Sequence, residues 1–306
     1  GSSLTLTATL SGKVDEAVTV SIGTSGTGTE GTDYSTISDI TISAGSTTGT
    51  ASFTPSDDSG DPVYEENETA IVAISSVSGG GATESGSQSI TLTITENESA
   101  PTVTLTSSAS SIAENAGSAL TLTATLSGKV DEAVTVSIGT SGTGTEGTDY
   151  STISDITISA GSTTGTAAFT PSDDSGDPVY EENETAIVAI SSVSGGGATE
   201  SGSQSITLTI TENESAPTVT LTSSASSIAE NAGSALTLTA TLSGKVDEAV
   251  TVSIGTSGTG TEGTDYSTIS DITISAGSTT GTAAFTPSDD SIYEDDETGI
   301  VAISGV

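Results

Sequence analysis

Apolar and polar residues alternate along several stretches of the chain, which is typical of half-buried β-strands. Residues 119–126 read Ala-Leu-Thr-Leu-Thr-Ala-Thr-Leu, and residues 134–138 and 206–210 place Val, Leu or Ile at every second position. Thr fills many of the positions between, where its branched side chain favours a strand and its hydroxyl suits a solvent-exposed face. The pattern predicts strands and argues against a disordered chain.

The strand pattern repeats at an interval of 116 residues, as the recurring string Leu-Ser-Gly-Lys-Val-Asp-Glu shows at Lys13, Lys129 and Lys245. Residues 1–100 differ from residues 117–216 only at Ser3/Ala119 and Ser52/Ala168. A repeat of this size is a whole domain, because solenoid repeats are 20–50 residues long. We therefore expect a tandem array of nearly identical domains.

Two Ala-Pro pairs, Ala100-Pro101 and Ala216-Pro217, divide the array into three units. Proline fixes its own φ and favours an extended residue before it, so these pairs predict short, stiff joints. The predicted units are residues 1–100, 101–216 and 217–306, called here the first, middle and third units.

The middle unit predicts seven strands separated by clusters of Gly, Ser, Asp and Asn, which are typical turn residues. Seven short strands without helical periodicity indicate an all-β fold, an antiparallel sandwich of immunoglobulin type. The predicted strands are Thr102–Thr106, Ala119–Leu126, Ala133–Ile138, Ile153–Ser159, Thr163–Thr170, Thr185–Ser191 and Gln204–Thr211.

The outer units are predicted to be incomplete. The first unit has no counterpart of the strand at 102–106, and the third has no counterpart of the strand at 204–211. Two interpretations are open: the chain is a window of a longer array, or neighbouring chains donate the missing strands.

Composition excludes several classes of function. The chain has 41 acidic residues against 3 basic ones, a formal net charge of -38, and no His, Cys, Met or Trp. Thiol or imidazole catalysis, Cys/His zinc sites and disulfides are therefore excluded, and we expect no enzyme. Nucleic acid and anionic membranes would be repelled, and no apolar run is long enough for insertion into a membrane.

The carboxylates cluster in the loops that follow alternate predicted strands, and such loops meet at one end of a sandwich. Crowded carboxylates repel one another unless they are protonated or bound to a cation. Oxygen ligands alone favour Ca²⁺, whereas Mg²⁺ prefers fewer carboxylates and retained water. The alternative is a solvated acidic surface without a metal.

Three strings carry a family resemblance: Glu-Asn-Ala-Gly, Gly-Thr-Asp-Tyr and Asp-Asp-Ser-Ile-Tyr-Glu-Asp-Asp-Glu-Thr. Together they resemble the Calx-β repeat, which occurs in sodium–calcium exchangers, integrin β4 and long bacterial surface proteins. The resemblance implies Ca²⁺ ligation by paired aspartates, two glutamates and a backbone carbonyl of the last string. It assigns these roles to Asp289, Asp290, Glu294, Glu297 and the carbonyl of Ile292, to Asp173, Asp174, Glu181 and Glu184, and to Asp57, Asp58, Glu65 and Glu68.

The two shorter strings imply further ligands, which are Glu114, Asp149, Glu230 and Asp265. The first and middle units depart from the family pattern, because they carry Gly-Asp-Pro-Val where the third unit has only Ile292. This insertion is expected to reshape the calcium loop.

Four Asn-X-Ser/Thr triplets are candidate glycosylation sites, and O-linked sugars on exposed Thr are the alternative. The triplets begin at Asn67, Asn97, Asn183 and Asn213.

Tandem sandwiches, stiff joints and calcium loops predict a non-enzymatic extracellular or cell-surface stalk, adhesin or filament. Its expected partners are other copies of itself and a cell-surface or carbohydrate ligand. The alternative is a calcium-sensing regulatory module of a larger membrane protein.

Overall fold

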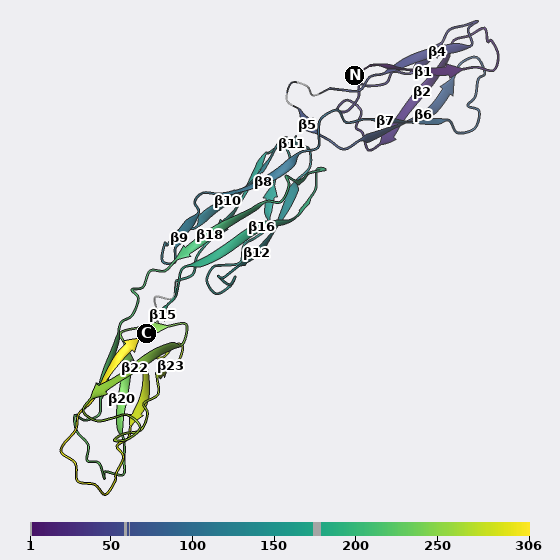
Figure 1. The fold of residues 1–306 in the computed structure, drawn as a ribbon. Helices are drawn as coiled ribbons and strands as arrows, with labels where there is room; N and C mark the ends of the chain where they lie inside the picture. The colour runs from purple at the N-terminus through teal and green to yellow at the C-terminus, as the bar shows by residue number, and fades with distance from the viewer. Residues whose placement is uncertain (1, 58–59, 61, 174–178) are drawn as a thin grey trace.

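The computed structural model describes residues 2–57, 60, 62–173 and 179–306, and every regular element in them is a β-strand. Three groups of strands follow one another in an elongated arrangement (Figure 1), each around its own buried hydrophobic cluster. In this part of the chain no helix is long and apolar enough to cross a membrane. The predicted all-β class with tandem sandwiches is confirmed.

The middle unit contains two sheets packed face to face. The first has the order β14 (Thr164–Phe169), β10 (Leu120–Leu126), β8 (Thr102–Ser107) and β17 (Thr199–Glu200). The second has the order β13 (Ile156–Ile158), β12 (Val134–Gly142), β16 (Glu184–Ser194), β18 (Ser205–Thr211) and β9 (Ser111–Ala113).

All seven predicted strands of the middle unit are present, and two additional short ones complete its sheets. β9 pairs in parallel with β18, and β17 pairs in parallel with β8. Two or three residues are too few for apolar alternation to be recognised, which is why the sequence did not indicate them.

The observed strand bounds differ from the predicted ones where residues pair in a sheet without being buried, or are buried without pairing in a sheet. β12 continues past Ile138 through a bulge, where Asp155 accepts hydrogen bonds from the Ile138 N–H at 3.2 Å and the Ser137 hydroxyl at 2.9 Å. The strand predicted at 153–159 is shorter in the structure, where only β13 forms. Ile153 is buried but lies in a loop, and its N–H donates to Glu146 instead of to a neighbouring strand. Alternation thus reports burial more reliably than pairing.

The core of the middle unit is built from the alternating positions. Leu122 and Ala124 of β10 are fully buried, while Thr121 between β10's apolar positions is exposed. The Tyr150 and Phe169 rings stack with centroids 4.9 Å apart, and the same pair recurs in the other units. The buried ring holds the loop before it against the end of the core.

The outer units repeat these elements in part. The first contains β1 (Leu4–Thr9), β2 (Val18–Gly26), β3 (Ile40–Ile42), β4 (Thr48–Phe53), β5 (Val63–Tyr64), β6 (Glu68–Ser78) and β7 (Ser89–Ile94). The third contains β19 (Val219–Ser223), β20 (Leu236–Leu242), β21 (Lys245–Val246), β22 (Val250–Gly258), β23 (Ile272–Ile274), β24 (Thr280–Phe285) and β25 (Gly299–Gly305).

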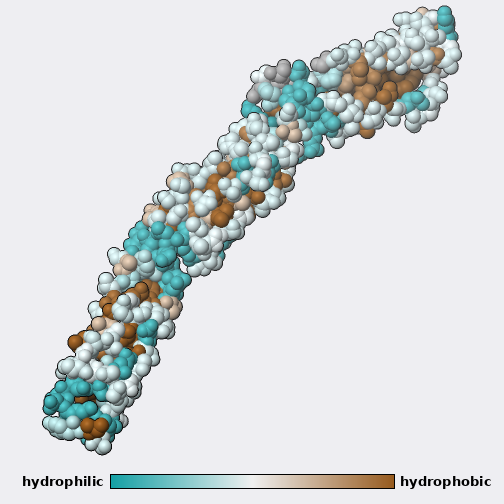
Figure 2. Space-filling model, in the orientation of Figure 1, coloured by the Kyte–Doolittle hydropathy of each residue, from teal (hydrophilic) through white to brown (hydrophobic). Residues whose placement is uncertain are grey.

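Both outer units have open sheet edges among the described residues. β1 pairs with β4 alone, and β25 pairs with β22 alone. Ile90 and Ile300 are accordingly 51% and 56% exposed, and Figure 2 shows apolar side chains gathered on one face of the first unit. These are the positions that the absent counterparts of β8 and β18 would cover.

Short strands join consecutive units. β5 pairs in parallel with β11 (Lys129–Val130), and β15 (Val179–Tyr180) pairs in parallel with β21. The Asp131 N–H also donates to the Tyr64 carbonyl at 3.3 Å. The sequence indicated the proline joints but not these contacts, which bring the end of one unit against the start of the next.

Candidate metal centre

Asp149 is positioned by a tight turn beside the core. Gly147, at φ 89°, donates its N–H to the Tyr150 carbonyl at 2.7 Å, and the Thr145 N–H donates to Asp149 Oδ2 at 2.5 Å. Because Tyr150 is buried, the carboxylate next to it is held at the end of the sandwich.

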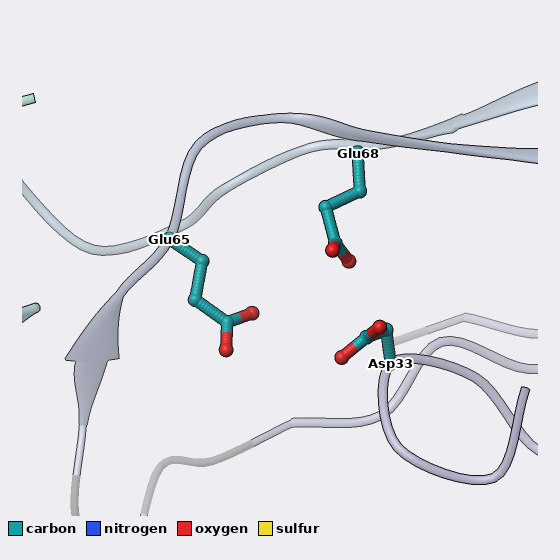
Figure 3. Close-up of side chains that lie close together, drawn as sticks. All are labelled: Asp33, Glu65 and Glu68. Atoms are coloured by element: carbon teal, nitrogen blue, oxygen red, sulfur yellow. The ribbon is translucent and has the colours of Figure 1, made fainter. Parts of the chain in front are cut away.

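Glu181 and Glu184 reach the same place from the other side, since Glu181 follows β15 and Glu184 begins β16. One carboxylate oxygen from each of Asp149, Glu181 and Glu184 lies within 4.8 Å of the others. Equivalent groups form in the other units, and Figure 3 shows the carboxylates of the first converging on one space. These groups, called here the carboxylate triads, are Asp149–Glu181–Glu184, Asp33–Glu65–Glu68 and Asp265–Glu294–Glu297.

The pairing of β9 with β18 brings Glu114, which directly follows β9, beside the middle triad. Glu114 lines the same hollow as Asp149, Glu181 and Glu184, and forms a second group of carboxylates with Glu212 and Glu214. Burial raises the pKa of Glu212, but hydrogen bonds from Glu214, Glu181 and Asn213 outweigh it and lower that pKa overall. The end of β18 therefore contributes a stable anion to this hollow.

Glu230 takes the position in the third unit that Glu114 has in the middle one. It lines a cavity of about 800 Å³ together with Asp265, Glu294 and Glu297. Its Oε1 accepts the Asp290 N–H at 3.3 Å. The structure thus brings together four of the residues that the resemblance assigned in this unit.

The aspartates of the Asp-Asp pairs, where the structure describes them, are not among the carboxylates that converge in the triads. Asp57, Asp173 and Asp289 are exposed and belong to none of the triads. Asp290 directly follows Asp289, and its side chain accepts the Ile292 N–H at 2.6 Å. The Ile292 side chain itself is 66% exposed. Asp58 and Asp174 lie outside the described residues, so their assignment stays a prediction.

Two triad glutamates have strongly raised pKa values. Burial raises the pKa of Glu68 and of Glu184 to about 7, assisted by the charge of the triad aspartate and then by that of the other triad glutamate. The charge of Asp131 in the next unit adds to the effect on Glu68, and Asp247 does so for Glu184. The triads therefore favour binding of a proton or a cation.

The raised pKa values predict that stability decreases as pH rises. The ordinary pKa of Glu is 4.5, so between pH 4.5 and about 7 the folded protein holds protons that the unfolded chain releases. In chelator, Glu68→Gln with Glu184→Gln should weaken this decrease in thermal melts across that range, whereas Glu66→Gln with Glu182→Gln should not. Equal pH dependence in both double variants would contradict the assignment.

Several members of these groups were not assigned from the sequence. The sequence could have identified Asp33, because it lies in the same Gly-Thr-Asp-Tyr string as Asp149. It gave a weaker indication of Glu212 and Glu214, which form an acidic string after the last strand. It gave no indication of Asp131 and its counterpart Asp247, because only the strand pairing across a joint brings them to the preceding unit.

The candidate glycosylation sites are engaged with the acidic loops. Asn67 and Asn183 accept the N–H groups of Glu96 and Glu212 through their side-chain oxygens, at 2.8 and 2.9 Å. The side-chain amides of Asn97 and Asn213 donate to Glu98 and Glu214. Glycosylation at these four positions stays a prediction.

The donor set fits a hard divalent cation. Ca²⁺ binds oxygen at 2.3–2.6 Å, so two ligand oxygens of one ion are at most about 5 Å apart. The 4.8 Å limit within each triad satisfies this condition, and backbone carbonyls and water would complete the coordination.

Comparison with known proteins identifies the domain family. The sequence model of the Calx-beta domain matches residues 3–98, 96–214 and 212–305, whereas no curated protein matches the chain. Among solved structures, CBD12 from CALX1.2 is similar at 16% identity with a TM-score of 0.28, over 66% of this chain and 76% of that one. Invasin, a bacterial integrin-binding protein, is similar at 16% identity with a TM-score of 0.30, over 98% of this chain and 56% of its own. Since the family match spans nearly the whole chain, the protein belongs to the Calx-beta family and carries three such domains in tandem.

Proposed function

We propose that the chain is part of a non-enzymatic extracellular stalk, adhesin or filament whose units are stiffened by Ca²⁺ at the joints. The observation that carries the proposal is the position of the triads. In the first and middle units one triad glutamate, Glu65 or Glu181, directly follows a tyrosine whose carbonyl accepts the N–H of an aspartate of the next unit, at 3.3 Å from Asp131 and 3.4 Å from Asp247.

The triads connect the core of one unit to its joint. Asp149 lies in the turn that ends at the buried Tyr150, whereas Glu181 directly follows Tyr180 of the joint strand β15. Without a cation, mutual repulsion among these carboxylates and Asp247 opposes close contact between units. Ca²⁺ supplies the positive charge that removes this repulsion, so that Asp149, Glu181 and Glu184 hold the joint strand against the core.

An extracellular location supports this use of calcium. Calcium sites of extracellular modules are typically weak, in the range of about 10⁻⁴–10⁻³ M, which suits triads that are partly exposed. The absence of Cys means that no disulfide stabilises the chain, and the absence of His and Cys favours a non-enzymatic role.

Self-association and an adhesive ligand belong to the same proposal. Units joined end to end would give elongated particles with an axial repeat of about 40 Å, from strands of about seven residues at 3.4 Å plus loops. Other copies of the chain and a cell-surface or carbohydrate ligand are the proposed partners.

Calorimetric titration with Ca²⁺ tests the proposal. We expect saturable binding at submillimolar to millimolar Ca²⁺, and weaker binding to the first triad in Asp131→Asn, because a charge beside that triad is lost. Glu132→Gln, which removes the same charge at the next residue, should bind as the unaltered protein does. An absence of binding at millimolar Ca²⁺ would overturn the proposal.

A further inference from the structure

Each joint contains a Val-Tyr pair that crosses from one unit to the next. The backbone of Val63–Tyr64 pairs with Lys129–Val130, and the Tyr64 ring packs against the buried core of the middle unit. The second joint repeats this arrangement, with Tyr180 packed against the core of the third unit and its carbonyl accepting the Asp247 N–H at 3.4 Å.

The Tyr64 ring lies on a turn of three glycines, Gly195–Gly197. A Cβ at Gly197 would lie 2.6 Å from Tyr64 Cε1 and 2.9 Å from the Tyr64 hydroxyl, so a larger residue would collide with the ring. A Cβ at Gly196 would meet Val130 at 2.9 Å. We call the surface formed by Lys129–Val130 and this glycine turn the tyrosine socket.

The chain contains unoccupied counterparts of both partners. Gly81 has the position of Gly197 in the first unit and a similar φ of +67°, yet a Cβ there would meet nothing within 4 Å. Tyr293 has the position of Tyr64 in the third unit and is 91% exposed. The close approach at Gly197 therefore comes from the tyrosine of the preceding unit and not from the turn itself.

We propose that Tyr64 and Tyr180, seated on the following unit, fix the orientation of consecutive units. The covalent linker at residues 95–101 alone is one attachment point, which leaves bending and twisting free. The seated tyrosine adds a second attachment from a different part of the chain. This device is separate from cation binding, although the triad residue Glu65 directly follows Tyr64 in the sequence.

Distances between spin labels test this role. The chain has no Cys, so pairs of introduced cysteines can be labelled without background. Thr41, Thr157 and Thr273 are exposed and occupy equivalent strands of the three units. Measurement in chelator and about 1 M KCl, where the Debye length is about 3 Å, removes calcium and screens the carboxylates.

We expect one narrow distance distribution for the 41/157 pair and one for the 157/273 pair. Tyr64→Ala should abolish the narrow peak of the first pair only, and Tyr180→Ala that of the second pair only. Tyr64→Phe should retain it because the ring remains, and Tyr293→Ala should change neither. Thermal melts establish that each variant is folded.

Two glycine variants separate the effect of displacing the Tyr64 ring from the effect of backbone strain. Gly197→Ala and Gly81→Ala impose the same strained φ, but only the former collides with a tyrosine. We expect Gly197→Ala alone to broaden the 41/157 distribution. If Tyr64→Ala and Gly197→Ala both leave that distribution as narrow as in the unaltered protein, the proposal is wrong. Because no calcium is present, this result is independent of the calcium titration.

Discussion

Saturating Ca²⁺ is expected to raise the midpoint of thermal unfolding by about 10 °C over that in chelator. Binding to the folded state alone at 100 times Kd stabilises by about 2.7 kcal/mol. For a domain of this size, each kcal/mol shifts the midpoint by roughly 3–5 °C. The reason lies in the triads, whose carboxylates repel one another until a cation is bound.

A matched pair of triple variants assigns this effect to the triads. Asp33→Asn, Asp149→Asn and Asp265→Asn together should abolish most of the calcium response, because each triad loses a charged ligand. An Asn oxygen can still accept the turn N–H that Asp149 accepts from Thr145. The control carries Glu16→Gln, Glu132→Gln and Glu248→Gln, which remove as many charges from equivalent exposed positions outside the triads and the hollows they line. Superimposed melting curves with calcium and with chelator would contradict the calcium assignment.

Much of the fold could be predicted because the sandwich depends on a short-range pattern. Alternation along Leu120–Leu126 specifies which face is buried, and the same alternation locates the other long strands. Strands of two or three residues, such as β9 and β17, depend on the partner beside them and leave no pattern of their own.

The candidate site was predictable only in its local part. Alternate loops end at the same side of a sandwich, which brings Glu114, Asp149, Glu181 and Glu184 together as expected. Asp131 and Asp247 could not be found in this way, because they approach a triad through pairing between units. The same holds for Tyr64, whose partner at Gly197 is more than one hundred residues away in the sequence.

Stiffening of the joints by calcium can be measured as the width of the 41/157 spin-label distance distribution at low ionic strength, with and without Ca²⁺. We predict a broad distribution in chelator, where the carboxylates of the first triad and Asp131 repel one another, and a narrow one in millimolar Ca²⁺. Asp33→Asn should leave the distribution broad in both. Identical distributions with and without Ca²⁺ in the unaltered protein would contradict stiffening of the joints by calcium.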